Sequence, residues 1–249
     1  MTEKVSTRFG TPHRHFRSVG STNTVARELA AAGAPHGTVV TADEQTAGRG
    51  RQGRTWTAPP GTALLYSAIV SPLGPRHPLL PLAVPLAVCE VAERLRPGVE
   101  CKVKWPNDVH LDGRKLAGIL IEARPQDQWA VVGVGLNLTI PQDDFPPELR
   151  ERATSLFADS RGVRNPSYGR ITNSAREILG ERIGEWVEAD EATVLGAWRK
   201  RDALLGREVG WETGSGVAEG IDERGYLLVR LADGERIALG AGEVHLTSF

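Results

Sequence analysis

The segment from Asp43 to Trp56 holds the residues best suited to chemistry. Three glycines alternate there with three arginines, in the order Gly48-Arg49-Gly50-Arg51-Gln52-Gly53-Arg54. Because glycine loses more conformational entropy on ordering than any other residue, three of them are not expected inside a helix or strand, but they suit a sharp turn or a close approach to a ligand. The guanidinium groups between them present fixed donors that match carboxylate or phosphate oxygens. The pattern predicts an anion-binding loop.

Two other interpretations fit the same loop. A Gly/Arg segment can be a flexible linker or a nucleic-acid-binding arm. Here it is short, occurs once and lies between the apolar segments 37–42 and 63–70, which gives the anion-binding loop a modest advantage. It is not a P-loop, because no Gly-Lys-Ser/Thr follows, and its glycine spacing is not that of a dinucleotide-binding fingerprint.

Polar residues also follow the first predicted strand, at residues 13–19. Ser21, Thr22 and Asn23 precede a helical pattern formed by Val25 and Leu29. Helix capping is the simpler interpretation of these side chains and the one that the spacing favours. A helix N-terminus also favours acceptor groups, so the same side chains could contact a polar ligand.

Two lysines and two glycines lie on predicted neighbouring strands. Residues 101–105 and 115–122 predict strands joined through a hairpin with Asp112-Gly113 as its tight turn, so Lys104 and Lys115 should lie in one region. If these lysines are exposed, they are ordinary surface residues. If they are buried, their ammonium groups require a neighbouring anion. Gly133 and Gly135 interrupt the strand predicted at 129–138, which indicates either a β-bulge or the close approach of another group.

The other periodic segments predict an α+β protein. Strands are expected at residues 37–42 and 62–71, and helices at 79–95, 172–188 and 191–202, with Pro85 as a kink or a late start of the first helix. After about residue 205 the sequence pattern changes and predicts short strands at 207–212, 216–221, 226–231 and 236–239, joined by glycine-rich turns. This pattern predicts a small C-terminal β-barrel of SH3 size.

Composition sets limits on location and partners. The 249 residues carry a net charge of −1, so no global field attracts nucleic acid or membrane. Cys89 and Cys101 match no metal spacing and no disulfide framework, which suits a reducing cytosol. The N-terminus lacks an apolar signal core, and the apolar segment 78–92 is too short to span a bilayer. We therefore expect a cytoplasmic protein without a membrane-bound part.

Taken together, these motifs resemble the bacterial biotin protein ligases. The resemblance rests on the Gly/Arg loop through Trp56, on Lys104-Trp105-Pro106-Asn107-Asp108, on residues 115–122 and on Gly133-Val134-Gly135-Leu136-Asn137, and it covers nearly the whole chain. It implies an α+β fold, with a mixed β-sheet catalytic domain and flanking helices, similar to class II synthetases, over residues 1–202. A C-terminal SH3-like β-barrel would then occupy residues 203–249.

The resemblance implies an ATP-dependent ligase of two steps. The biotin carboxylate attacks the α-phosphate of ATP, and biotinyl-5′-AMP and pyrophosphate form. A lysine amine on the biotin carboxyl carrier domain of an acyl-CoA or pyruvate carboxylase then attacks this mixed anhydride and releases AMP. Two anions must meet in the first step, so fixed cations are needed, and the adenylate must be shielded from water before the second. Mg²⁺ would enter with ATP, and no separate metal site is expected.

The resemblance also assigns roles to individual residues. The implied catalytic residues are Lys115, Arg51 and Arg49, with Lys115 facing the carboxylate and the α-phosphate. The implied biotin-binding residues are Ser21, Thr22, Asn23, Gln45, Gly48, Arg49, Gly50, Arg51, Trp56, Lys115, Gly118, Leu120, Gly133 and Gly135. The implied ATP-binding residues are Arg51, Arg54, Trp56, Lys104, Asn107, Lys115 and Asn137.

The chain differs from some members of the family at two points, and two other functions fit part of its sequence. The chain begins about a dozen residues before the first predicted strand, so we expect no DNA-binding domain and no repressor activity. Thr247 stands where some members carry an arginine that reaches the nucleotide, which puts a C-terminal contribution to ATP binding in doubt. Both a monomer and a homodimer fit the family. The alternatives are a lipoate or octanoyl ligase of the same fold and a nucleic-acid-binding regulator, against which the near-neutral charge argues.

Overall fold

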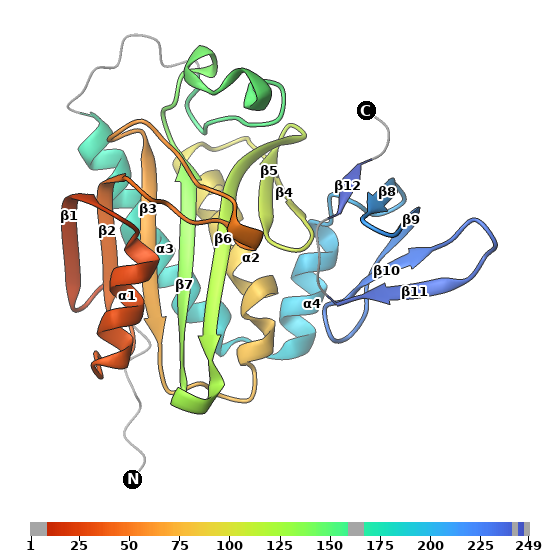
Figure 1. Ribbon diagram of the computed structural model, residues 1–249, viewed down its shortest axis with the longest axis horizontal. Coiled ribbons are helices and arrows are strands. Elements are labelled where there is room, and N and C mark those ends of the chain that lie inside the picture. Colours follow the sequence, from red (N-terminus) through yellow and green to blue (C-terminus); the bar gives the residue numbers. More distant parts are fainter. Residues whose placement is uncertain (1–8, 159–166, 241–243, 247–249) are drawn as a thin grey trace.

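Two β-sheets organise the computed structural model, which describes residues 9–158, 167–240 and 244–246 (Figure 1). The larger sheet has the spatial order β1-β2-β3-β7-β6-β5-β4. Its strands are β1 (His13–Val19), β2 (Val39–Gln45), β3 (Ala63–Val70), β4 (Cys101–Lys104), β5 (Asp108–Leu111), β6 (Arg114–Arg124) and β7 (Trp129–Asn137). β1 and β2 pair in parallel and all other neighbours are antiparallel, so the predicted mixed sheet is confirmed.

Helices cover both faces of this sheet. The helices are α1 (Thr22–Ala31), α2 (Leu80–Leu95), α3 (Ser167–Glu188) and α4 (Glu191–Lys200). Side chains alternate between the faces of a strand. Accordingly Ile69 of β3 packs in the cluster that contains Ala26 of α1, whereas its neighbour Ala68 packs in the cluster that contains α2. Because both faces are covered, every residue of β3 is buried.

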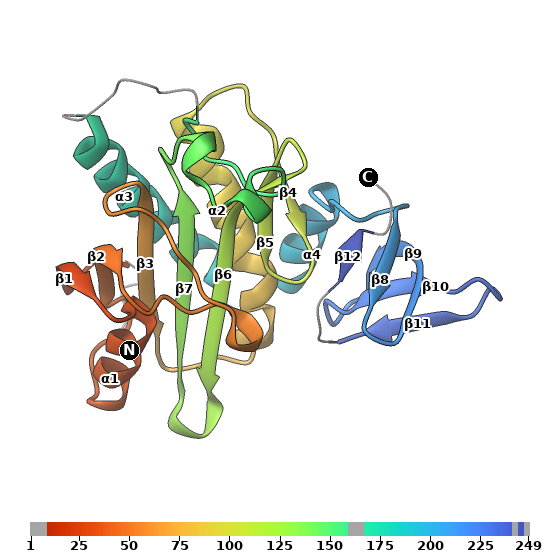
Figure 2. The ribbon, with the colours of Figure 1, turned by 45° about the horizontal axis from the view of Figure 1, so that its top comes forward.

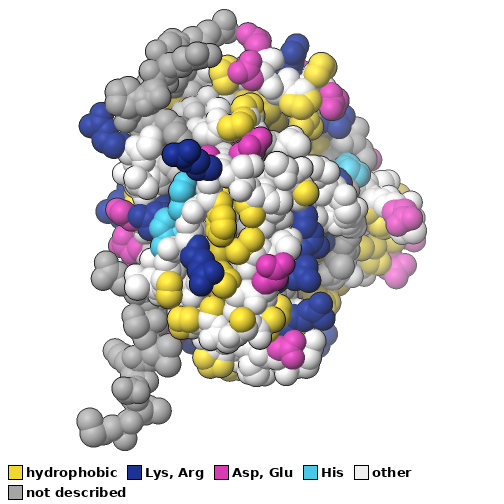
Figure 3. Space-filling view, turned by 60° about the vertical axis from the view of Figure 1, so that its left-hand side comes forward, with side chains coloured by type: hydrophobic (Ala, Val, Ile, Leu, Met, Phe, Trp, Pro, Cys, Tyr) yellow, Lys and Arg dark blue, Asp and Glu magenta, His cyan; other side chains and the backbone are white. Residues whose placement is uncertain are grey.

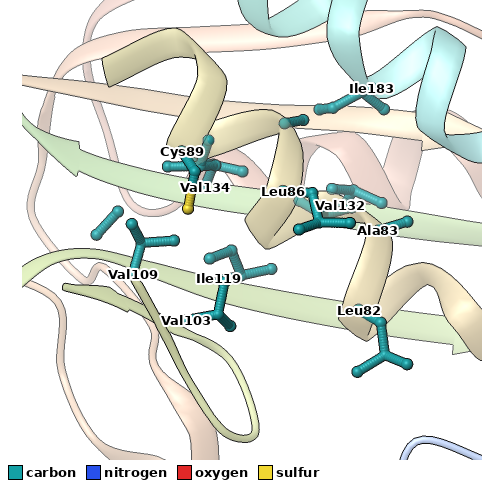
Figure 4. Packing of buried hydrophobic residues seen from close by; sticks show 14 of the residues in the cluster. Leu82, Ala83, Leu86, Cys89, Val103, Val109, Ile119, Val132, Val134 and Ile183 are labelled. Carbon is teal, nitrogen blue, oxygen red and sulfur yellow. The ribbon is translucent and has the colours of Figure 1, made fainter. Parts of the chain in front are cut away.

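The main core lies between α2 and the sheet. Leu82, Leu86 and Cys89 of α2 face strand residues such as Val134, with α3 behind them (Figure 4). Pro85 lies inside α2 and is buried, and the helix begins at Leu80. The expected late start of this helix is therefore wrong, because packing of the flanking apolar residues offsets the hydrogen bond that a proline cannot donate.

The predicted hairpin between β5 and β6 is confirmed. Asp112 and Gly113 connect the two strands with φ values of 51° and 76°. Positive φ at both central residues is the geometry of the tight hairpin turn that the Asp-Gly pair predicts.

The C-terminal strands form a separate antiparallel sheet beside α4 and β4 (Figures 1 and 2). It consists of β8 (Glu208–Trp211), β9 (Gly214–Ile221), β10 (Leu227–Arg230), β11 (Arg236–Leu239) and β12 (His245–Leu246), in the order β11-β10-β9-β8-β12. The first four match predicted strands, whereas β12 was not predicted. The buried Trp105 indole donates to the carbonyl oxygen of Gly225 at 3.0 Å and so links the two sheets.

The face displayed in Figure 3 has no dominant charge. Acidic and basic side chains are interspersed on the face that Figure 3 displays. Among the described helices, none is both long enough and apolar enough to cross a membrane.

Candidate active site

A cavity of about 500 Å³ lies on the α1 face of the large sheet. It lies where β6 and β7 carry glycine in place of larger side chains: Gly118 pairs with Gly135, and Gly133 pairs with Leu120. The segment that follows β2 crosses in front of these two strands (Figures 1 and 2). The glycines of β6 and β7 leave space on the sheet, and the segment after β2 covers this space. The result is a pocket of the size that takes a small-molecule ligand.

The cavity gathers almost the whole predicted site. The predicted residues that line it are Ser21, Thr22, Asn23, Gln45, Arg49, Gly50, Arg51, Arg54, Trp56, Lys104, Asn107, Lys115, Gly118, Leu120, Gly133, Gly135 and Asn137. Gly48 alone among the predicted site residues does not line it. These residues come from α1 and its N-cap, from β2, β4, β6 and β7, from the Gly/Arg loop and from the turn between β4 and β5, so only the tertiary fold brings them together.

The Gly/Arg loop is a tight hairpin over the cavity. The amide of Trp56 donates to Gly48 O at 3.0 Å, and that of Gly50 donates to Arg54 O at 2.7 Å. A Cβ atom at Gly48 would lie 2.3 Å from the carbonyl oxygen of Trp56, a distance that is sterically excluded. Glycine is therefore required at this position by the hairpin itself.

Hydroxyl and amide groups form a polar wall on one side of the cavity. The backbone N–H and the hydroxyl of Thr22 lie 2.7 and 2.9 Å from Oε1 of Gln45 and donate to it. Ser21 is the N-cap of α1, but its side chain makes no capping hydrogen bond. Ser21 therefore occupies the predicted N-cap position without capping through its side chain, and it lines the cavity.

Ser67 completes this wall and was not predicted. Its hydroxyl group donates to Oδ1 of Asn23 at 2.6 Å and lies 2.8 Å from the hydroxyl oxygen of Thr22. Ser67 is fully buried, and it pairs with Gly133 across β3 and β7. The available signal was a single serine among the mainly apolar residues 63–70, because the hydroxyl group of a buried serine needs a partner.

The two interrupting glycines make room for other side chains. A Cβ atom at Gly133 would lie 2.1 Å from Oδ1 of Asn23, and one at Gly135 would lie 2.4 Å from the Trp56 ring. The pairing of β7 with β3 and β6 shows no register shift at either glycine. The β-bulge interpretation is therefore wrong, and the alternative of a close approach is confirmed. The groups that approach are Asn23 and Trp56, and contact of these glycines with biotin stays a prediction.

Lys115 is held at both its backbone and its side chain. Its N–H donates to Arg152 O at 2.7 Å, and its carbonyl oxygen accepts from Thr154 N–H at 2.9 Å. Its Nζ atom lies 2.7 Å from Oδ1 of Asp108 and 5.8 Å from the centroid of the Trp56 ring, in cation–π range. The segment after β7 thus fixes the position of this ammonium group.

Two predicted nucleotide contacts have protein partners. Oδ1 of Asn107 accepts from Arg51 Nη1 at 3.1 Å, and its amide nitrogen donates to Ile119 O at 2.6 Å. The buried Asn137 amide donates to Thr154 O at 3.0 Å. Both side chains therefore position neighbouring parts of the cavity wall, and their contact with ATP stays a prediction.

His110 also lines the cavity, although sequence reasoning gave no histidine a role. Its Nδ1 lies 3.0 Å from the carbonyl oxygen of Gly113, which can only accept, so Nδ1 carries the proton. Burial lowers the pKa of His110 to about 4, with smaller contributions from the nearby Lys104 and Lys115, which oppose its protonation, and from Asp108, which favours it. The imidazole is therefore neutral at pH 7.

Further lining residues come from two segments that the predictions missed. The segment after β7 contributes Phe145, Pro146, Leu149 and Arg152, and β12 contributes His245 and Leu246. The C-terminal sheet therefore does reach the cavity. Thr247, the position of the expected departure, lies outside the described residues.

In the part of the chain that the structure describes, no cluster of metal ligands accompanies the cavity. Within the described ranges, no group of three or more His, Cys, Asp or Glu side chains is arranged to hold a metal ion. Cys89 and Cys101 are both buried and form no disulfide.

Comparison with known proteins identifies the family. Residues 15–138 match the model of the biotin/lipoate A/B protein ligase family, and residues 204–246 match that of the biotin protein ligase C-terminal domain. The chain is 36% identical over 237 residues to the biotin–[acetyl-CoA-carboxylase] ligase of Mycobacterium tuberculosis, covering 90% of this chain and 85% of that protein. The chain belongs to the biotin protein ligase family.

Other members of the biotin protein ligase family support this assignment. The bifunctional ligase/repressor BirA of Bacillus spizizenii is 33% identical over 225 residues, covering 87% of this chain and 68% of that protein. The solved structure of the Aquifex aeolicus biotin protein ligase in complex with biotin and ATP superposes with a TM-score of 0.76 at 27% identity, covering 94% of this chain and 97% of that one. The solved structure of the Leishmania major biotin protein ligase in complex with biotinyl-5-AMP superposes with a TM-score of 0.59 at 28% identity, covering 92% of this chain and 98% of that one.

Proposed function

We propose that this biotin protein ligase activates biotin with ATP to biotinyl-5′-AMP and then transfers biotin to a lysine of a biotin carboxyl carrier protein. The observation that carries the proposal is that one cavity combines the polar wall at Thr22 and Gln45 with the cationic side chains of Arg49, Arg51 and Lys115. Such a cavity is complementary to a ligand with a hydrogen-bonding ring system at one end and an anion at the other. Biotin has these two ends.

The polar wall binds the ureido end of biotin. Ser21, Thr22, Asn23 and Gln45 supply hydroxyl and amide groups, while Trp56 and Leu120 supply apolar contact for the rest of the ligand. A site built to hydrogen-bond a particular polar group discriminates strongly against analogues that lack this group, since its own buried polar atoms would then be unpaired. This wall is the basis for preferring biotin over lipoate, which lacks the ureido group.

The cations promote the first step by bringing two anions together. Lys115, Arg49 and Arg51 neutralise the biotin carboxylate and the α-phosphate, while Lys104 and Arg54 hold the other phosphates and Asn107 and Asn137 the nucleotide. Charge compensation of this kind is worth much more in a cavity that excludes water than in bulk solvent. The rest of the rate enhancement comes from positioning both reactants, and no covalent enzyme intermediate is required. Mg²⁺ enters with ATP as part of the substrate.

The second step requires that the adenylate be protected from water until the carrier arrives. The Gly/Arg loop lies over the cavity, and Arg49 and Arg51 within it interact with the new phosphate linkage. The acceptor is the carrier domain of an acyl-CoA or pyruvate carboxylase, whose lysine amine displaces AMP. The catalytic domain spans residues 1–202 and the SH3-like domain spans residues 203–249. The protein acts in the cytoplasm as a monomer or homodimer and does not bind DNA.

Calorimetric titration tests the substrate class. Biotin and lipoate are each titrated into the protein with and without a non-hydrolysable ATP analogue. Tight binding of biotin without a lipoate signal is expected, since the polar wall requires a ureido group. Binding of lipoate but not biotin would assign the chain to lipoate ligation, and binding of neither would overturn the assignment of the cavity.

A further inference from the structure

The carboxylate of Glu122 lies just beyond the cavity and binds three donors. Oε2 accepts from Asn23 Nδ2 at 3.0 Å, and Oε1 accepts from Arg49 Nη1 at 3.0 Å and from Arg27 Nη1 at 3.3 Å. Arg49 Nη1 also lies 3.3 Å from Oε2. Two of these donors, Asn23 and Arg49, line the cavity, whereas Glu122 itself does not.

The sheet explains why a carboxylate stands at this point. Glu122 pairs with Val131 across β6 and β7, and Leu120 pairs with Gly133 in the next row. Paired residues share a face, so Glu122 points to the same face as the cavity. Its side chain is only 21% exposed, so the loss of hydration must be offset by donors. Asn23, Arg27 and Arg49 are those donors.

Glu122 and the carbonyl oxygen of Leu120, to which Asn23 Nδ2 also donates at 3.3 Å, together orient the Asn23 amide. A carboxylate only accepts hydrogen bonds, so the NH₂ group of Asn23 must face Glu122. Oδ1 of Asn23 then faces the hydroxyl group of Ser67, which donates to it at 2.6 Å. A continuous set of polar contacts therefore runs from Gln45 through Thr22, Ser67, Asn23 and Glu122 to Arg49.

We propose that Glu122 is a positioning residue of the ligase, which joins the polar wall of the cavity to the anion-binding loop. On one side it provides the shorter of the two contacts that orient Asn23 in the polar wall, 3.0 Å against 3.3 Å for Leu120 O. On the other it holds the Arg49 guanidinium through Nη1, and a guanidinium carries five N–H donors, so others are left for a ligand anion. This inference rests on the proposed function, because both ends of the contact set are assigned to the same substrate.

Substitution of Glu122 tests the proposal through biotin affinity. Glu122→Ala removes the carboxylate that accepts from Asn23 and Arg49 and leaves Asn23 Nδ2 with the longer contact to Leu120 O. We expect the Kd for biotin to rise about tenfold, the effect of losing one charge-assisted hydrogen bond. Glu122→Gln should be similar, because its NH₂ group faces donors, and Glu122→Asp should recover part of the affinity. The matched control is Glu219→Ala, which removes a carboxylate that binds Arg230 and Arg236 at 2.8 Å in the C-terminal sheet. This control should bind biotin as the wild type does.

A double-mutant cycle separates positioning from a general structural effect. If Glu122 acts through Arg49, Arg49→Ala should weaken biotin binding by a much smaller factor in the Glu122→Ala background than in the wild type. Equal factors in both backgrounds would contradict the proposal, as would wild-type affinity in both Glu122→Ala and Glu122→Gln. Glu122→Gln, which keeps the size of the side chain, gives the result if the alanine variant does not fold. Absence of biotin binding by the wild type would instead overturn the proposed function.

Discussion

The ammonium group of Lys115 lies 2.7 Å from the carboxylate of Asp108 on the neighbouring strand, and both residues line the cavity. This pair places a cation at a defined point, because the backbone of Lys115 is also fixed by Arg152 and Thr154. A substrate carboxylate or phosphate that approaches Lys115 meets a group whose position has already been set. Preorganised charge of this kind is the largest contribution to catalysis in many enzymes.

Removal of the Lys115 ammonium group should abolish adenylate formation. We expect Lys115→Ala to lower the rate by about 100-fold or more, the typical effect of removing one preorganised group that stabilises charge. Pyrophosphate release with biotin and ATP measures this step without a carrier protein. Lys102→Ala is the control. Lys102 lies on the same strand as Lys104 and forms an ion pair with Glu100, but it does not line the cavity. A near-wild-type rate for Lys115→Ala would show that the assigned role is wrong.

Asp108 should affect the rate more than biotin affinity. Asp108→Asn keeps the shape of the side chain but removes the charge that holds Lys115, so we expect kcat to fall about tenfold, the loss of one charge-assisted contact. The Kd for biotin should change less, because Asp108 follows Asn107, which is assigned to the nucleotide, and is not part of the polar wall assigned to the ureido end of biotin. Steady-state kinetics combined with calorimetry measures both quantities. A loss confined to biotin affinity would contradict this division.

Arg51 should retain the adenylate more than it accelerates its formation. Its guanidinium donates to Asn107 at 3.1 Å, so it links the loop to the floor of the cavity. We expect Arg51→Ala to form adenylate at a measurable rate but to release it into solution, where a filter-binding or chromatographic assay detects it. The control is Arg236→Ala, in the C-terminal sheet, at a side chain that is 71% exposed. If Arg51→Ala retains its adenylate as the wild type does, the loop does not have the proposed sequestering role.

Gly135 should not tolerate even one added methyl group. Gly135→Ala places Cβ about 2.4 Å from the Trp56 ring, so we expect weaker biotin binding and a lower unfolding temperature. The control is Gly196→Ala inside α4, where an added Cβ would meet nothing within 4 Å beyond the backbone of its own helix and where alanine should stabilise the helix by about 1 kcal/mol. Thermal unfolding and biotin titration of both variants provide the measurement. Wild-type behaviour of Gly135→Ala would mean that Trp56 does not need to lie against bare backbone.

Sequence reasoning succeeded for conformations that depend on residues close together along the chain. The Gly/Arg loop and the Asp112-Gly113 turn were predictable, because their conformations are local. The roles of Ser67 and Glu122 were not predictable, because their partners are distant in sequence. Asn23 lies 44 residues from Ser67, and Arg49 lies 73 residues from Glu122. A lone polar residue in an apolar strand signals that a partner exists, but only the order of strands β3, β7 and β6 shows which residue it is.

His110 should make stability depend on pH below neutrality. Its folded pKa of about 4 lies below the ordinary value of 6.5, so the unfolded chain takes up a proton that the folded chain resists. The resulting stabilisation is fully present above pH 6.5 and is lost as the pH falls from 6.5 to 4. His110→Gln should therefore lose less stability than the wild type between pH 7.5 and pH 5, as measured by urea unfolding. The matched control is His77→Gln, because His77 Nδ1 lies 3.1 Å from the carbonyl oxygen of Gly74 in an exposed turn. Equal losses in wild type and His110→Gln would show that His110 titrates alike in the folded and unfolded chain.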